Sequence, residues 1–229
     1  MKCVILQPSY IPWRGYFDQI SRADVFVFYD DVQYDTRGWR NRNRIKTVDG
    51  SRWVSIPVNA KGAQTEHIPI NQIKIAWSQP WNSEHLKALQ HAYAKAPFYN
   101  DLKPLLEEFY DRRDEYLADF TIDFTIALAR HMGIQHTQFL RSSQLNAQGA
   151  KTDRLIDVLL KVGADHYISG PSARDYIEND KFAEHNITLE YMDYHYGEYT
   201  QLYPPYDPQV SIVDTLVMLG PQTLASIKG

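Results

Sequence analysis

Polar and aromatic residues follow the first apolar run of the chain. The run Cys3–Leu6 is long enough for a buried strand, and Pro8 prevents its continuation as a central strand. The loop behind it carries Gln7, Tyr10, Trp13 and Tyr16. A ligand site needs polar groups for orientation and aromatic faces for stacking, so this loop is a candidate substrate-binding segment. The alternative is that these aromatic side chains are core residues at the end of a sheet.

A second apolar run, Val25–Tyr29, ends in the acidic pair Asp30-Asp31. Strand, loop, short helix and strand form a βαβ unit, whose ligands lie at the carboxyl ends of the strands. We therefore expect Gln7 and Asp30 at one edge of a sheet, where Asp30 is a candidate general base for an amine proton. The acidic pair could instead hold a magnesium ion bridged to a diphosphate, or be an ordinary acidic turn.

The segment Gly38–Lys46 carries four cationic side chains within seven residues. A guanidinium holds phosphate or carboxylate in a planar fork, and an asparagine amide donates and accepts at once. In an extended arm the alternating Arg40, Arg42 and Arg44 share one face, and Asn41 and Asn43 share the other. This pattern predicts an anion-binding arm with Asn41, Arg42 and Asn43 as substrate-binding residues; the alternative is a solvated basic hairpin.

A later turn, Ser169-Gly170-Pro171-Ser172, follows a predicted strand and opens a predicted helix through Tyr176. Amides and hydroxyls at such a turn can face an anion. The alternative is that the turn only connects a strand to a helix. His195, between two tyrosines, is a second candidate base. The histidines lack a metal-binding spacing, so we expect no metal site and no cofactor.

Several motifs together resemble the WbqC-like protein family. They are Gln7-Pro8-x-Tyr10-x-Pro12-Trp13-x-Gly15-Tyr16-Phe17, Ala23-Asp24-Val25-Phe26, Asp30-Asp31-Val32-Gln33-Tyr34, Trp39-x-Asn41-Arg42-Asn43-x-Ile45-Lys46, Ala92-Tyr93-x-Lys95-Ala96-Pro97, Thr152-x-Arg154-Leu155, Ile168-Ser169-Gly170 and Ser211-Ile212-x-Asp214. The resemblance covers nearly the whole chain, and its first block is specific. We add Thr152, Arg154 and Tyr176 to the expected substrate-binding residues.

The resemblance implies a role in bacterial surface-polysaccharide biosynthesis, such as that of O-antigen and lipopolysaccharide, or in a natural-product pathway. The expected activity is that of a transferase that joins an acyl or aminoacyl group, such as glycyl, to the amine of a nucleotide-linked amino sugar. The alternative is a non-catalytic accessory protein of the same pathway that binds a nucleotide or a sugar. The expected partners are therefore a small-molecule acceptor and an acyl or aminoacyl donor.

The amino-acid composition argues against several other classes of protein. The chain of 229 residues has a net charge of −4, which argues against non-specific binding to DNA because that requires a basic footprint. Its one cysteine, Cys3, excludes an internal disulfide. No apolar stretch approaches the ~20 residues that span a bilayer, and Met1-Lys2 leads straight into strand-like sequence. We expect a cytoplasmic protein without membrane insertion; the sequence leaves its oligomeric state open.

Alternation of apolar runs and helical periods predicts an α/β fold. We expect a central parallel Rossmann-like sheet containing 2–7, 25–29, 137–140, 165–168 and 187–192. A β-rich insertion at about 32–75 and a helical insertion at about 82–132 interrupt this pattern. We expect residues 1–229 to form a single α/β domain with these two insertions.

Overall fold

The protein is built around a five-stranded parallel sheet in the order β7-β2-β1-β8-β9. The structure is a computed structural model that describes residues 1–228. The strands are β1 (Lys2–Leu6), β2 (Val25–Phe28), β7 (Gln138–Arg141), β8 (His166–Ser169) and β9 (Thr188–Tyr191). All four neighbouring pairs are parallel. The predicted α/β fold with a central parallel sheet is confirmed.

The two central strands are apolar on both faces because helices cover both sides of the sheet. Val4, Phe26 and Phe28 face one hydrophobic cluster, whereas the alternate residues Ile5 and Val27 face a second cluster. Successive side chains of a strand point to opposite faces, so each short apolar run supplies both cores. This is why neither strand shows an alternation of polar and apolar residues.

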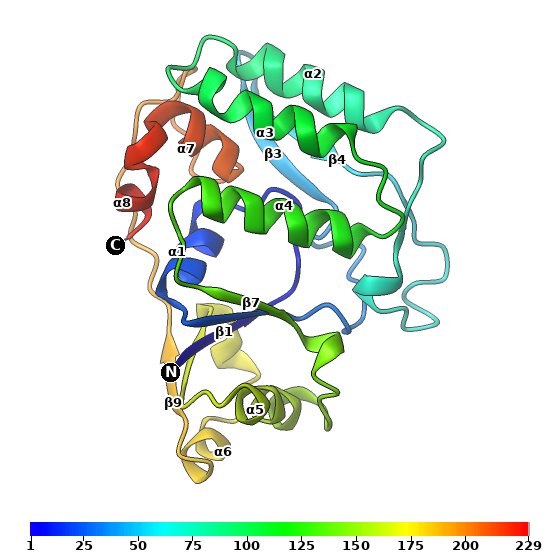
Figure 1. The fold of residues 1–229 in the computed structure, drawn as a ribbon, viewed down its shortest axis with the longest axis vertical. Coiled ribbons are helices and arrows are strands. Elements are labelled where there is room, and N and C mark those ends of the chain that lie inside the picture. The colour runs from blue at the N-terminus through cyan, green and yellow to red at the C-terminus, as the bar shows by residue number, and fades with distance from the viewer. Residues whose placement is uncertain (229) are drawn as a thin grey trace.

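Different helices cover the two faces of the sheet (Figure 1). Helices α5 (Lys151–Val162) and α6 (Asn179–Glu184) contribute to the smaller cluster. Helices α1 (Arg14–Arg22), α4 (Leu117–His131) and α8 (Thr223–Ile227) contribute to the larger one. Helix α5 ends at Gly163, whose φ of 73° is left-handed and suits glycine at a helix end.

The predicted helical insertion is confirmed and lies on the same side of the sheet as α1. It consists of α2 (Trp81–Tyr93), α3 (Tyr99–Asp111) and α4. Helix α7 (Ile212–Leu219) packs against α3 and begins at Ser211, whose hydroxyl accepts a hydrogen bond from Val213 N at 3.2 Å. Among residues 1–228, none of the helices has the length and apolarity required to traverse a bilayer.

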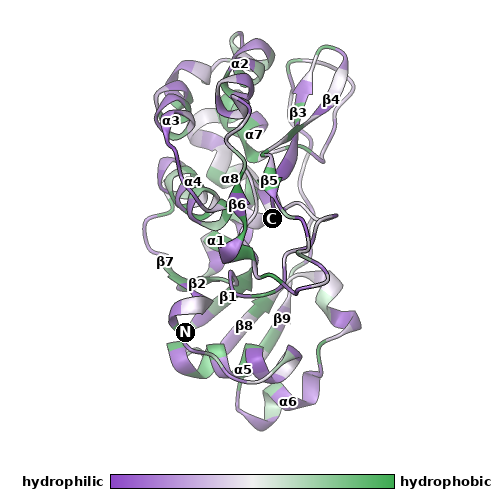
Figure 2. Cartoon of the chain, turned by 90° about the vertical axis from the view of Figure 1, so that its right-hand side faces the viewer, coloured by the Kyte–Doolittle hydropathy of each residue, from purple (hydrophilic) through white to green (hydrophobic). Residues whose placement is uncertain are grey.

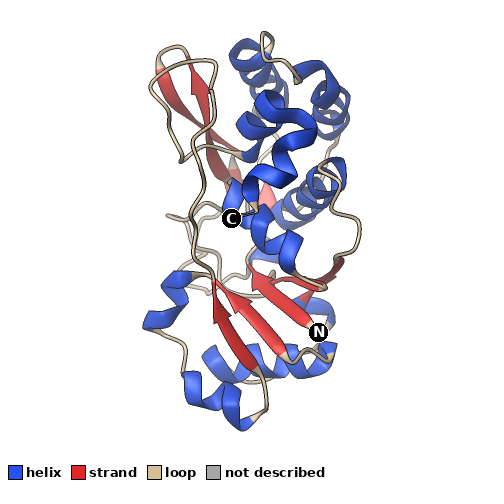
Figure 3. Ribbon diagram, turned by 90° about the vertical axis from the view of Figure 1, so that its left-hand side faces the viewer, coloured by secondary structure: helices blue, strands red, loops and turns tan. Residues whose placement is uncertain are grey.

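The segment between 32 and 75 is β-rich, as predicted. Strands β3 (Arg42–Thr47) and β4 (Gly50–Ser55) form an antiparallel hairpin, and β5 (Val58–Asn59) pairs with β6 (Lys74–Ile75). The hairpin projects away from α5 and α6 (Figures 2 and 3). The short 3-10 helices are η1 (Ile70–Gln72), η2 (Ser142–Gln144), η3 (Pro171–Asp175) and η4 (Gly220–Gln222). The helix expected after Gly170 is therefore a brief 3-10 turn.

Candidate functional site

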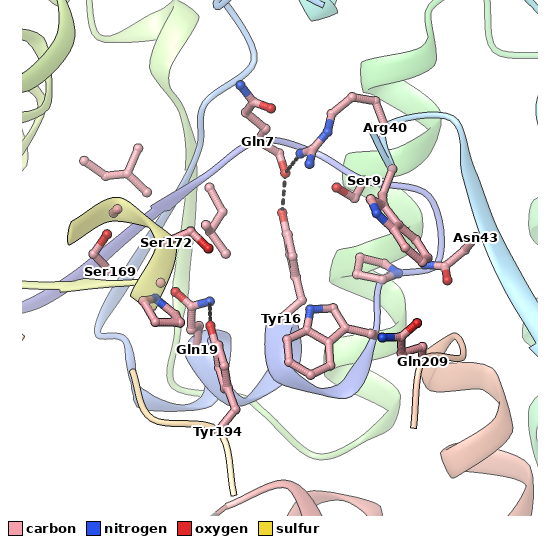
Figure 4. A pocket seen from close by; sticks show the side chains of 18 of the residues that line it. Gln7, Ser9, Tyr16, Gln19, Arg40, Asn43, Ser169, Ser172, Tyr194 and Gln209 are labelled. Atoms are coloured by element: carbon pink, nitrogen blue, oxygen red, sulfur yellow. Dashed lines mark hydrogen bonds between the residues drawn. The ribbon is translucent and has the colours of Figure 1, made fainter. Parts of the chain in front are cut away.

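A cavity of about 690 Å³ opens at the carboxyl ends of β1 and β8. This volume lies within the range of small-molecule sites. Its walls come from these two strand ends, the loop before α1, α1 itself, the arm before β3, η3 and the loop after β9 (Figure 4). The lining residues are Ile5, Leu6, Gln7, Ser9, Pro12, Trp13, Tyr16, Gln19, Trp39, Arg40, Asn43, Tyr167, Ser169, Gly170, Pro171, Ser172, Ala173, Tyr176, Tyr194 and Gln209.

The end of β1 is fixed by two side chains that donate to one carbonyl. The Tyr16 hydroxyl donates to the carbonyl oxygen of Gln7 at 3.0 Å, and Nη1 of Arg40 donates to the same oxygen at 3.1 Å (Figure 4). Burial raises the pKa of Tyr16, so its hydroxyl keeps its proton and remains a donor. Helix α1 and the arm before β3 are thereby tied to the strand end on which the cavity is built.

The spacing of Trp13 and Gly15 places an indole in the cavity wall. A Cβ atom added at Gly15 would lie 2.4 Å from the Trp13 ring, closer than atoms approach without displacement. Glycine at position 15 therefore lets the indole fold back over the first turn of α1. There the ring of Trp13 meets the ring of Tyr194 edge to face, with centroids 5.0 Å apart.

Gln19 and Tyr194 leave an acceptor available at the wall. Nε2 of Gln19 donates to the Tyr194 hydroxyl at 2.6 Å (Figure 4). Oε1 of Gln19 is buried and has no hydrogen-bond partner among residues 1–228. Such an oxygen is costly to bury, so a ligand that donates an O–H or N–H group to it gains free energy.

Arg40, on the side of the cavity opposite Gln19, has a hydrogen-bond donor without a partner. Nη1 also reaches the Pro8 carbonyl at 3.4 Å, whereas the buried Nε has no partner within the described chain. No carboxylate of residues 1–228 lies within ion-pairing distance of this guanidinium. Burial lowers the pKa of Arg40, while Tyr16 and Asp35 act in the opposite direction. A bound anion would offset the desolvation of this cation.

The cavity contains one cationic side chain and no acidic one. None of its lining residues, all within the described chain, is Asp, Glu, His, Lys or Cys. Its other polar groups are amides, hydroxyls and two indoles, which bind rings and hydroxyls without adding charge. The site is therefore suited to a neutral ring that carries an anionic group.

Many of the predicted substrate-binding residues meet at this cavity. Gln7, Trp13, Tyr16, Asn43, Ser169, Gly170 and Tyr176 line it. Asn43 also shapes the loop, because its Nδ2 donates to the carbonyl oxygens of Tyr10 at 3.1 Å and Ile11 at 2.9 Å. Across the cavity, a Cβ at Gly170 would lie 3.8 Å from the Tyr194 hydroxyl, so little spare space separates β8 from the late loop.

Tyr10 lies in the core rather than at the cavity, although its neighbours Ser9 and Pro12 line the cavity. The left-handed φ of 34° at Ile11 accompanies a reversal of the loop, and the Tyr10 ring is fully buried. Its hydroxyl lies 2.9 Å from Nδ1 of His85 and contacts the hydroxyl of Tyr110. Burial lowers the pKa of His85 to about 4. The alternative interpretation of a core aromatic describes this position.

Asn41 and Arg42 point away from the cavity. Nδ2 of Asn41 donates to the carbonyl oxygen of Ile56 at 2.8 Å. Arg42 donates to the carbonyl oxygens of Gly38 at 3.2 Å and Arg37 at 2.7 Å, and its guanidinium lies 4.8 Å from the centroid of the Trp53 ring. The arm thus reaches the cavity through Trp39, Arg40 and Asn43, because the regular alternation begins only with β3.

Asp30 belongs to a separate polar cluster at the end of β2. The buried carboxylate accepts hydrogen bonds from Ser142 Oγ at 3.2 Å, Ser143 N at 3.0 Å and Ser143 Oγ at 2.8 Å. Its neighbour Asp31 forms an ion pair with Arg154 at 2.5 Å. These contacts lie outside the cavity lining, and a catalytic role for Asp30 stays a prediction.

Thr152 and His195 also lie outside the cavity lining. The Thr152 hydroxyl accepts a hydrogen bond from Glu178 N at 3.2 Å, which ties α5 to the segment before α6. His195 is exposed and lies 2.9 Å from the Asp193 carboxylate. It directly follows the cavity residue Tyr194, and its role as a base stays a prediction.

Sequence reasoning missed several residues of the wall. They are Ser9, Gln19, Trp39, Arg40, Tyr167, Ser172, Tyr194 and Gln209. A usable signal existed for Tyr194, because it follows β9, whose carboxyl end faces the same edge of the sheet as those of β1 and β8. Arg40 stood in the recognised basic arm, but the strand that orients the arm begins only at Arg42.

The described residues contain no group of three or more His, Cys, Asp or Glu side chains arranged to hold a metal ion. The Asp30-Asp31 pair has the serine and arginine partners given above, and these occupy its oxygens in the structure. The magnesium interpretation of that pair therefore gains no support from the arrangement of side chains around it.

Comparison with known proteins identifies relatives of the whole chain. A family model described as the WbqC-like protein family matches residues 7–226. The uncharacterized protein Rv1507c of Mycobacterium tuberculosis (strain ATCC 25618 / H37Rv) is 37% identical over 221 residues, which cover 96% of this chain and 94% of that protein. No solved structure gives a significant match.

Proposed function

The chain belongs to the WbqC-like protein family, and from this premise we propose that it joins an acyl or aminoacyl group to the amine of a nucleotide-linked amino sugar. The sugar occupies the cavity at the ends of β1 and β8, and its diphosphate binds Arg40. The proposed setting is the biosynthesis of a bacterial surface polysaccharide or natural product in the cytoplasm.

One observation carries this proposal: a half-buried guanidinium, with a buried Nε and no carboxylate in ion-pair contact, in a cavity whose lining has no acidic side chain. An anionic ligand recovers part of the electrostatic free energy that Arg40 loses on burial. Aromatic rings at Trp13 and Tyr194 offer faces and edges for a sugar ring, and Gln19 Oε1 offers an acceptor for its hydroxyl or amino group.

The absence of acidic side chains from the lining also favours a nucleophilic amine. A carboxylate beside a bound amine would stabilise its protonated form, whereas burial near a cation disfavours that form. The uncharged amine nitrogen then attacks the carbonyl carbon of an activated acyl donor. The new C–N bond forms, the bond from the carbonyl carbon to the leaving group breaks, and the amine proton leaves with that group or enters water.

The same cavity also supports a second candidate function. None of the lining residues of the described chain is a histidine or a carboxylate, so neither of these common general bases faces the proposed acceptor. This observation favours a non-catalytic accessory protein that binds the nucleotide sugar and delivers it to another enzyme. Under this alternative the bound ligand and the role of Arg40 are the same, and only turnover is missing.

Calorimetry with nucleotide-linked amino sugars tests the shared part of both candidates. Arg40→Lys keeps the charge and loses the bidentate fork, so we expect affinity to fall about tenfold. The matched control is Arg113→Lys in the helical layer, where the guanidinium donates to Asn82 at 3.1 Å; its affinity should equal that of the wild type. Unchanged affinity in Arg40→Lys would remove Arg40 from the site.

Product analysis separates the two candidates. The protein is incubated with the nucleotide-linked amino sugar that binds best and with a panel of acyl and aminoacyl thioesters. Mass spectrometry then looks for the amide. Formation of amide faster than in protein-free solution, and reduced in Arg40→Lys, supports the transferase. Tight binding without amide from any donor supports the accessory protein.

A further inference from the structure

Four of the large apolar side chains that remain exposed line the cavity or pack against its lining. Among residues 1–228 these side chains are Met1, Trp13, Trp39, Val48, Trp53, Leu160 and Tyr176. Trp13, Trp39 and Tyr176 line the cavity, and Trp53 packs against Trp39 with ring centroids 4.8 Å apart. Such a concentration of exposed aromatic surface beside a cavity marks a binding surface.

Trp39 and Trp53 are held in place while keeping much of their surface exposed. Trp39 is 38% exposed and Trp53 is 44% exposed. The guanidinium of Arg42 lies 4.8 Å from the centroid of the Trp53 ring, and that of Arg44 lies 5.8 Å from it. The hairpin register sets this arrangement, because Trp53 on β4 lies directly opposite Arg44 on β3.

Arginine contacts restrain the two indoles from the side of the hairpin. Arg42 is anchored to the backbone of Gly38 and Arg37, and Nη2 of Arg44 donates to Gln209 Oε1 at 2.7 Å. Both cations are therefore fixed near Trp53 instead of moving freely in solvent. The two aromatic rings are held rigidly, and two guanidinium groups beside them supply positive charge. This arrangement favours a planar ring system attached to phosphate over a flexible acyl chain.

We propose that Trp39 and Trp53 form a stacking subsite for the nucleobase of the nucleotide-linked sugar. This inference rests on the proposed function, since the sugar ring fills the cavity and the diphosphate binds Arg40. Arg40 follows Trp39 directly in the chain, so a diphosphate on Arg40 directs the remainder of the ligand toward the tryptophan pair. The order along the ligand is sugar beside Trp13 and Tyr194, phosphates at Arg40, and base on Trp39 and Trp53.

Two probes separate the base from the rest of the ligand. Glucosamine 1-phosphate carries the amino sugar and one phosphate without a base. A panel of UDP, dTDP, GDP and CDP carries base and diphosphate without the sugar. We expect wild-type protein to bind at least one nucleoside diphosphate and to bind the corresponding nucleotide-linked glucosamine more tightly than glucosamine 1-phosphate, as measured by calorimetry.

The decisive variant is Trp53→Leu, because Trp53 lies outside the cavity lining. It should weaken binding of the nucleoside diphosphate and of the nucleotide sugar about tenfold, while binding of glucosamine 1-phosphate is unchanged. Trp53→Tyr keeps an aromatic face and should restore most of the affinity. Leu160→Ala, which changes an exposed apolar side chain on α5, is the matched control and should bind all three ligands as the wild type does.

Each other outcome overturns the inference in a recognisable way. Equal weakening of glucosamine 1-phosphate in Trp53→Leu would assign the pair to the sugar or to the fold. Unaltered binding of every ligand in Trp53→Leu would remove the pair from the site. Loss of binding to anionic phospholipid vesicles, with nucleotide binding intact, would make the pair a membrane contact. Binding of glucosamine 1-phosphate without any nucleoside diphosphate would overturn the base subsite alone, whereas no binding of either probe would overturn the proposed function too.

Discussion

Two neighbouring strands of the same sheet end in very different polar environments. At the end of β2, the carboxylates of Asp30 and Asp31 accept from Ser142, Ser143 and Arg154, and of these side chains only Arg154 has an atom, Nε, without a partner among residues 1–228. At the end of β1, the polar side chains surround a cavity and leave Arg40 Nε and Gln19 Oε1 without partners in the described chain. The first set holds the protein together, and the second set is available to a ligand.

This difference shows why a polar strand end is weak evidence for a site. Both ends follow the rule that ligands bind at the carboxyl edge of a parallel sheet. What distinguishes them is whether the carboxylates and donors meet each other directly, as at β2, or surround a cavity, as at β1. The residues that meet there are distant in sequence, since Ser142 follows β7 and Tyr194 follows β9. Only the assembled fold brings them to the respective strand ends.

The largest expected effect is on the stability of the protein and comes from the Asp30 cluster at the end of β2. Asp30→Ala removes a buried carboxylate and leaves both Ser143 donors unpaired, whereas the Ser142 hydroxyl keeps Asp31 as its acceptor. We expect the free energy of unfolding in urea to fall by about 3 kcal/mol. Asp193→Ala, at an exposed carboxylate, is the control and should stay within about 0.5 kcal/mol of the wild type.

The contrast between the ends of β1 and β2 would not hold if Asp30 took part in ligand binding or turnover. Asp30→Asn keeps the shape of the side chain and should fold, with ligand affinity and any amide formation unchanged. Normal stability combined with lost turnover in Asp30→Asn would instead support the predicted role of Asp30 as a general base.

A smaller effect is expected from the buried cluster of Tyr10, His85 and Tyr110. Burial lowers the pKa of His85 to about 4, Arg52 acts in the same direction, and the backbone of Ser55 opposes the shift. Between the unfolded pKa near 6.5 and the folded pKa near 4, the unfolded chain binds more protons. Stability from this group is therefore complete above pH 6.5 and is lost as the pH falls toward 4.

We expect the difference in unfolding free energy between wild type and His85→Gln to change by about 2 kcal/mol from pH 7 to pH 5, in the direction that weakens the wild type at the lower pH. Urea unfolding of both proteins at the two pH values measures this difference. A constant difference would show that His85 is not held neutral by the core, and a parallel change in ligand affinity would return Tyr10 to the site.

The sequence was a good guide to the fold because the main signals are local. The continuous apolar runs around Val4 and Val27 predict strands buried on both faces, and the five predicted strands are found in one parallel sheet. The helical insertion was equally readable, since α2, α3 and α4 have regular apolar periods. Patterns of this kind depend on a few neighbouring residues and survive in the assembled protein.

The sequence was a poorer guide to side-chain direction in loops. Tyr10 and Trp13 lie three residues apart in one loop, yet Tyr10 enters the core and Trp13 enters the cavity wall. The reversal at Ile11 and the contact of Trp13 with Gly15 decide this difference, and neither follows a period of two or 3.6 residues. For the same reason Arg40, which precedes β3, reaches the cavity while the predicted Arg42 does not.

The central claim is that the cavity binds a nucleotide-linked amino sugar with its amine uncharged. Calorimetry in several buffers of different ionisation enthalpy measures it directly, at a pH just below the pKa of the free amine. We predict that binding of the amino sugar releases protons to the buffer, whereas its N-acetyl analogue binds without proton release. Proton uptake, or an enthalpy independent of the buffer for the amino sugar, would contradict the account.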